Sequence, residues 1–168
     1  MFNIGDLLFY GTNGVCRVSE ICSSPFDSSD TRSFYKLTPM AENSSLVIYT
    51  PVDNTQVVMR SLISKDEAEA LVARLPSIEK ITVSIEKHRK DAYREAIRDG
   101  SPEGFVRIIK TVRERRELFR KTRRRVPDLE NDFEHTARTC LYGELSAVLG
   151  ICREDIHRII LESIEQAQ

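Results

Sequence analysis

The sequence contains no tryptophan, and it has only three histidines and four cysteines in 168 residues. Cys16, Cys22, Cys140 and Cys152 form no C-x-x-C pair, and the histidines supply no close pair of ligands either. A structural zinc site needs such pairs, so we expect no bound metal. Without a secretory context we also expect no disulfide, and the cysteines should act as small buried hydrophobic residues.

Signatures of catalysis are missing as well. The chain has no glycine-rich phosphate loop, no G-x-S-x-G and no H-E-x-x-H, and no histidine lies near an evident nucleophile in the sequence. Catalytic triads are assembled in space, so these absences argue against an enzyme without excluding one. We expect a non-enzymatic protein with no cofactor and no small-molecule substrate.

Long apolar segments are also absent. No run approaches the roughly 20 residues that span a bilayer. Residues 1–6 carry no basic group of the kind that begins a signal peptide. We therefore expect a cytoplasmic protein that has no membrane partner.

Charge is unevenly distributed along a chain whose totals nearly cancel, with 25 Lys and Arg against 26 Asp and Glu. Residues 1–78 hold 6 basic and 9 acidic side chains, residues 79–125 hold 16 and 8, and residues 126–168 hold 3 and 9. Such asymmetry between segments favours a surface that binds a polyanion, located in residues 79–125.

Residues 1–62 have the pattern of short β-strands. Gly11 to Gly14 has strong turn chemistry, and residues 23–30 are rich in Ser, Asp and Pro and should form a loop. Pro51 should end a strand because proline cannot donate to a ladder. The predicted strands are 7–10, 15–21, 33–37, 45–50 and 57–60. Short strands packed this densely favour a small, strongly bent antiparallel barrel or half-barrel.

From Ser64 onward the pattern becomes helical. Ser64 and Glu67 have the spacing of a capping box, Pro76 ends the first helix, and residues 76–84 form a candidate linker. Further helices are predicted over 85–99, from 102, from 128 to Gly150, and over 153–164. Strands followed by helices predict an α+β chain. We expect a β domain over 1–62, a connecting helix and linker over 63–84, and a helical domain over 85–168.

The first basic helix separates apolar from charged residues. On a helical wheel of residues 85–99, Ile85, Ala92 and Ala96 share one side, which should face a core. His88 falls on that side and is expected to be a packed or partly exposed ring. The opposite side collects Lys87, Lys90, Arg94 and Arg98.

The next helix has a similar division. Arg107, Lys110 and Lys121 lie opposite its apolar stripe, and Leu118 lies off the stripe. Residues 113–125 hold eight basic side chains and end in the triplet Arg123, Arg124 and Arg125. The apolar stripe, which should be core, consists of Phe105, Ile108, Ile109, Val112 and Phe119.

Each charged feature also has a plainer explanation. The basic stripe of residues 87–98 could be a solvated face, partly neutralised by Asp91 and Glu95, although the repeated basic bias favours contact with a nucleic-acid backbone. The triplet could bind nucleic acid, pair with acidic residues of the last two helices, or lie in a hydrated turn. Likewise, the strand at 46–50 could be a buried central strand or an edge open to β-augmentation.

Several motifs of the β half resemble the CarD/CdnL family of bacterial transcription regulators. They are Phe2-x-Ile4-Gly5-Asp6, Phe9-Tyr10-x-x-x-Gly14-Val15, Tyr35-x-Leu37, Pro51-Val52-Asp53-Asn54 and Met59-Arg60. The same module is similar to the polymerase-interacting domain of the transcription-repair coupling factor. The helical half resembles the family more loosely, through its length, its Asp99-Gly100-Ser101 break and its basic helices.

The resemblance implies a Tudor-like β domain that docks on the RNA polymerase β subunit. It also implies a helical domain that contacts promoter DNA and modulates the stability of the open complex. The family strand that pairs with polymerase corresponds here to Leu46, Val47, Ile48, Tyr49 and Thr50, followed by Pro51. Together with the charge pattern, the resemblance assigns DNA contact to Lys87, His88, Arg89, Lys90, Arg94, Arg98, Arg123, Arg124 and Arg125.

One departure concerns the start of the first basic helix. Many family members carry a tryptophan there as a minor-groove wedge, whereas this chain has Glu86 at or near that position. The comparison therefore favours phosphate contact over insertion between bases. Two other functions stay open: a nucleic-acid-binding protein that acts without polymerase, and an adaptor whose basic face binds an acidic protein.

Overall fold

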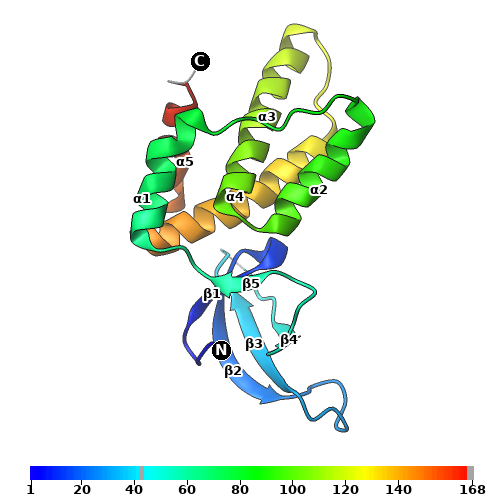
Figure 1. The fold of residues 1–168 in the computed structure, drawn as a ribbon, viewed down its shortest axis with the longest axis vertical. Coiled ribbons are helices and arrows are strands. Elements are labelled where there is room, and N and C mark those ends of the chain that lie inside the picture. The colour runs from blue at the N-terminus through cyan, green and yellow to red at the C-terminus, as the bar shows by residue number, and fades with distance from the viewer. Residues whose placement is uncertain (42–43, 166–168) are drawn as a thin grey trace. The chain divides into compact units, whose positions relative to one another are not determined.

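A computed structural model describes residues 1–41 and 44–165 of the chain. The chain divides into two compact units, Met1–Leu62 and Ile63–Gln168. The first contains a five-stranded antiparallel sheet and the second contains five α-helices, which confirms the predicted α+β class (Figure 1).

The sheet of the first unit has the strand order β4-β3-β2-β1-β5. Its strands are β1 (Leu7–Tyr10), β2 (Val15–Ser23), β3 (Ser33–Pro39), β4 (Ile48–Pro51) and β5 (Met59–Ser61). A 3-10 turn, Gly11–Asn13, joins β1 to β2. Within the described residues, β4 and β5 are the two edges of the sheet.

The fourth strand begins at Ile48, three residues later than predicted, and Pro39 explains the difference. Leu37 pairs with Ile48 and Tyr35 with Thr50. The Val52 amide donates to the Ser33 carbonyl, so by alternation these two pairs are the ones that exchange main-chain hydrogen bonds. The next hydrogen-bonded pair would require the N–H of residue 39 to donate to the Leu46 carbonyl, and Pro39 has no N–H. Pairing therefore stops at Ile48.

One face of the sheet carries the hydrophobic core of the first unit. The register of β2 against β3 shifts between Val18 and Glu20, a bulge that increases the local twist and bends the sheet. Cys16 is fully buried in this core, as predicted, and burial raises the pKa of its thiol to about 12. Cys152 is exposed and Cys22 is only half-buried, so the prediction of burial is wrong for these two cysteines. The core consists of Leu8, Tyr10, Cys16, Val18, Tyr35 and Leu37.

The second unit begins with the predicted capping box. The Glu67 amide donates to Ser64 Oγ over 3.2 Å, and the Ser64 amide donates to Glu67 Oε2 over 2.7 Å. Gly100 and Gly150 adopt φ values of 67° and 70° at two helix ends, a left-handed conformation that glycine permits. The helices are α1 (Lys65–Arg74), α2 (Arg89–Asp99), α3 (Pro102–Lys121), α4 (Asp128–Leu149) and α5 (Arg153–Glu165).

The core of the second unit lies where α3 packs against α2 and α4, and where α4 packs against α1 and α5. The stripe of α3 is buried as predicted from Phe105 to Val112. Ile85 was predicted to face the core and is instead 52% exposed. The reason is that α2 begins only at Arg89, after a 3-10 turn (Glu86–His88), so an α-helical wheel does not apply to residue 85. Tyr93 fills the core in its place.

The most consequential correction concerns Lys110, which was predicted to face solvent and is only 7% exposed. Its Nζ donates to the carbonyl oxygens of Leu75 (2.6 Å), Pro76 (3.1 Å) and Ile78 (2.7 Å). Burial lowers the pKa of this ammonium group. The Ile81 amide also donates to Thr111 Oγ1 over 2.8 Å. Residues 76–84, the candidate linker, are therefore fastened to α3.

Candidate functional site

Strand β4 is an edge strand, so some of its N–H and C=O groups face away from β3. The alternation of hydrogen bonds along the strand shows which residues these are. The Val52 amide donates to the Ser33 carbonyl over 2.9 Å. In an antiparallel pair, residues alternate between facing the partner strand with both main-chain groups and facing away with both. Two residues before Val52, Thr50 therefore faces β3, and Tyr49 directs its N–H and C=O away from β3.

The open edge is short. Pro51 has the same outward parity as Tyr49 but has no N–H, and its carbonyl accepts from the Asn54 amide over 3.1 Å. Ahead of β4, Leu46 and Val47 expose their side chains. Within β4, Tyr49 is therefore the residue able to exchange two main-chain hydrogen bonds with an added strand.

The side chains of β4 divide between the two faces of the sheet. Ile48 packs against the core and Thr50 is buried, whereas Tyr49, between them, projects from the opposite face, here called the outer face, and is half-buried. The Phe26 ring contacts Tyr49 edge-on, with centroids 5.9 Å apart and planes at 87°. Phe26 belongs to the loop between β2 and β3, and sequence reasoning missed it because that loop was assigned only from its polar residues.

The predicted DNA-contacting residues fall in two places of the second unit. Lys87 and His88 lie in the 3-10 turn before α2, and α2 itself carries Arg89, Lys90, Arg94 and Arg98. The triplet follows α3. All are exposed except Arg89, which is half-buried. His88, expected on the core side, is exposed because it precedes the α-helix.

These cations differ in whether an acidic group neutralises them. Arg89 pairs with Glu86 over 3.0 Å, Arg94 with Asp91 over 3.5 Å, and Arg125 with Asp128 over 2.7 Å. The Arg89 hydrogen bond lowers the pKa of Glu86. Within residues 1–41 and 44–165, five members of the predicted set form no ion pair: Lys87, Lys90, Arg98, Arg123 and Arg124.

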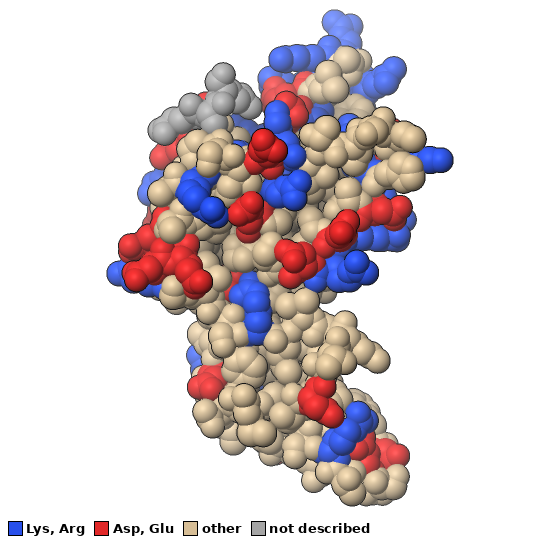
Figure 2. Space-filling view, in the orientation of Figure 1, with Lys and Arg blue, Asp and Glu red and all other residues tan. Residues whose placement is uncertain are grey.

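The middle of α3 contributes less positive charge than its sequence indicates. Arg115 binds Glu130 and Glu86, each over 2.6 Å, and Arg116 binds Glu134. Both acceptors on α4 are buried, so these arginines attach α3 to α4. The space-filling view accordingly shows Lys and Arg gathered at the end of α3, and Lys and Arg mixed with acidic side chains along α2 (Figure 2).

The end of α3 has an unusual backbone. Arg123 has a φ of 55°, the left-handed conformation that usually belongs to glycine. The Arg124 amide donates to the Phe119 carbonyl over 2.8 Å, which closes the helix end around Arg123. Such a conformation costs a non-glycine residue on the order of 1 kcal/mol. The strained turn leaves the whole triplet exposed.

Comparison with protein families identifies the first unit. Residues 2–63 match the family model of the CarD-like/TRCF RID domain. The N-terminal unit is a CarD-like/TRCF RID domain. This family consists of RNA polymerase-interacting domains, so the match points to a role in transcription through contact with RNA polymerase. A search of curated proteins found no match to the chain.

The RID domain contains all five strands, and therefore contains the open edge at β4. The resemblance inferred from motifs of the β half is confirmed for these residues. The helical unit and its cations lie outside the family match. Contact of the RID domain with one particular polymerase subunit, and contact of the helices with DNA, stay predictions.

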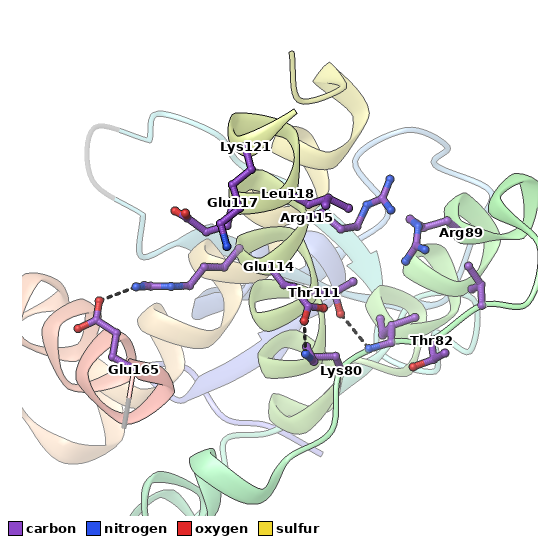
Figure 3. Close-up of a pocket in the computed structure, with 13 residues that line it drawn as sticks. Lys80, Thr82, Arg89, Thr111, Glu114, Arg115, Glu117, Leu118, Lys121 and Glu165 are labelled. Atoms are coloured by element: carbon purple, nitrogen blue, oxygen red, sulfur yellow. Dashed lines mark hydrogen bonds and ion pairs between the residues drawn. The ribbon is translucent and has the colours of Figure 1, made fainter. Parts of the chain in front are cut away.

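A groove of ≈ 840 Å³ lies outside the RID domain, between residues 80–83 and α3 (Figure 3). Its charged groups largely pair with one another, Lys80 with Glu114 and Arg113 with Glu165. Leu118 and Lys121 also line it.

The described residues include no group of three or more His, Cys, Asp or Glu able to hold a metal ion. None of their helices is long and apolar enough to cross a membrane.

Proposed function

We propose that this protein regulates transcription initiation by binding the RNA polymerase β subunit through β4 and promoter DNA through its exposed cations. The match of residues 2–63 to the RID family, together with the open edge at β4, carries this proposal. The β subunit supplies an extended segment that pairs with Tyr49 in the manner of β-augmentation. The protein acts without catalysing a reaction.

The DNA contact is electrostatic and depends on the polymerase contact. Five exposed cations of the predicted set form no ion pair within the described residues. Lys87, Lys90 and Arg98 lie in or just before α2, and Arg123 and Arg124 follow α3. Phosphate contacts position a protein but carry little sequence information. Binding to polymerase raises the effective concentration of this weak surface at the promoter, and the complex supplies the specificity.

The first experiment compares three ligands for the full chain: core RNA polymerase, a promoter duplex, and the polymerase–promoter complex. The proposal expects measurable binding to polymerase, weak binding to the duplex, and the tightest binding to the complex. Equal affinity for the duplex and the complex would instead favour a nucleic-acid-binding protein that acts alone. Binding to polymerase without any crosslink to DNA would favour an adaptor that uses its cations on an acidic protein.

A charge-neutralised variant tests the DNA surface. Lys90→Ala combined with Arg98→Ala should weaken binding to the polymerase–promoter complex and reduce the slope of log K against log salt by about 0.9 per lost phosphate contact. Affinity for polymerase alone should not change. These two residues are chosen over Arg94 because Arg94 already pairs with Asp91.

The matched control removes the same charge elsewhere in the helical unit. Lys65→Ala combined with Arg158→Ala acts on α1 and α5, where both residues take part in exposed ion pairs. That variant should retain the wild-type salt slope. If the two double variants reduce the slope equally, net charge and not the surface of α2 governs DNA binding.

A further inference from the structure

Phe26 is a large apolar side chain exposed to solvent. It is 76% exposed, although its ring contacts Tyr49 on the outer face of β4. Scattered exposed hydrophobic residues are ordinary on a protein surface. Phe26 differs because it adjoins Tyr49, the β4 residue that directs both its N–H and its C=O outward, and because exposed Leu46 and Val47 precede that strand.

The loop that carries Phe26 is ordered by its own hydrogen bonds. Ser24 Oγ accepts from the amides of Phe26 (3.4 Å) and Asp27 (3.2 Å). Asp27 Oδ1 in turn accepts from the Ser29 amide over 2.8 Å. These side-chain turns fix the backbone on both sides of Phe26. A loop whose backbone is ordered before binding loses less entropy when a partner covers it.

Strand geometry determines what would meet this ring. When a strand is added to a sheet, the residue opposite Tyr49 projects its side chain on the same face as Tyr49, with Cβ atoms about 5 Å apart. On this sheet that is the outer face, where Phe26 lies against Tyr49. The incoming side chain would therefore contact aromatic rings, and a charged group there would lose hydration, since Lys36, the cross-strand neighbour of Tyr49, already pairs with Glu20 over 3.3 Å.

We propose that Phe26 is a specificity-determining residue of the polymerase contact. With Tyr49 it forms an aromatic pair that accepts an apolar side chain from the polymerase segment added to β4. This inference rests on the proposed function, since it requires that an extended polymerase segment binds at β4. It adds a residue outside β4 and states the chemistry of the side chain that the partner must present.

The test measures binding of full-chain variants to core RNA polymerase. Phe26→Ala should weaken binding about tenfold, a typical effect for an aromatic residue at the centre of an interface. Phe26→Tyr keeps the ring and should bind like the wild type. Leu118→Ala is the matched control, because Leu118 is 56% exposed on α3 and lies outside the RID domain. Thermal unfolding of each variant verifies that the fold is retained.

A double variant tests whether the two rings act as one site. If they share one partner side chain, Phe26→Ala with Tyr49→Ala should lose less affinity than the two single losses multiplied. Because the contact is apolar, the ratio of wild-type to Phe26→Ala affinity should stay constant as salt rises.

The outcomes separate this inference from the proposed function. If Phe26→Ala binds like the wild type while Tyr49 variants lose affinity, the role of Phe26 is overturned and the β4 contact stands. If the two losses multiply fully, the rings make separate contacts and the shared pair is overturned. If the wild-type chain does not bind polymerase, the proposed function fails and the inference fails with it.

Discussion

Replacing Lys110 with methionine is expected to lower the free energy of unfolding of the helical unit by about 3 kcal/mol. The methionine would fill much of the same space but leave the carbonyls of Leu75, Pro76 and Ile78 without the donor that now serves all three. An unsatisfied buried acceptor costs about 1–3 kcal/mol. The measurement is urea unfolding of the full chain, followed by the helical circular dichroism signal.

Lys121→Met provides the control, because it makes the same chemical change on the same helix at an exposed position. It should alter the free energy of unfolding by no more than about 0.5 kcal/mol. A Lys110→Met variant as stable as Lys121→Met would show that the ammonium group does not fasten residues 75–78 to α3. The double variant with Thr111→Val would then reveal whether the Ile81 amide holds this segment instead.

Features encoded by neighbouring residues were predicted correctly from the sequence. The capping box needs only Ser64 and Glu67 at the correct spacing, and the two helix ends need a glycine that tolerates a positive φ. Strand β1 follows from a short apolar run that ends at the Gly11–Gly14 turn, and β2 follows from the alternation of apolar and polar residues over 15–21. In each case, the residues that determine the structure lie within a few positions of one another.

Features that depend on distant partners were missed. The wheel placed Lys110 opposite the apolar stripe, but its acceptors lie 32–35 residues earlier in the chain. No local pattern reports such a contact. The number of basic residues in α3 overstated its exposed positive charge for a related reason, since Glu130 and Glu134 on α4 bind Arg115 and Arg116. There the sequence did contain a signal, two carboxylates four residues apart on a helix adjacent to α3 in sequence.

The candidate polymerase contact lies between these cases. The motifs around Pro51 directed the prediction to residues 46–51, but periodicity alone left β4 equally compatible with a central or an edge position. Strand order decides this, and strand order is a property of the whole sheet. Phe26 needed the loop conformation, which places a residue 23 positions before Tyr49 against its ring.

Tyr49→Pro is expected to bind core RNA polymerase about tenfold more weakly than Tyr49→Ala does. Both changes remove the phenol ring, so their difference isolates the main chain. Proline also removes the outward N–H, which leaves a carbonyl of the added strand without its donor. The substitution breaks no bond to β3, because the Tyr49 amide faces away from that strand. Equilibrium binding of the full-chain variants to core polymerase measures this difference.

β4 already contains Pro51, whose main chain faces away from β3 as that of Tyr49 does. Prolines within sheets are usually found on edge strands. Thr50→Pro is the opposing control: it removes an amide that faces β3 and should destabilise the RID domain itself. If Tyr49→Pro and Tyr49→Ala bind equally well while Thr50→Pro alone unfolds the sheet, polymerase contacts only side chains at β4. If Tyr49→Pro is also unfolded, Tyr49 faces β3 and the parity assignment is wrong. Only weaker binding by a folded Tyr49→Pro variant is the result that strand addition predicts.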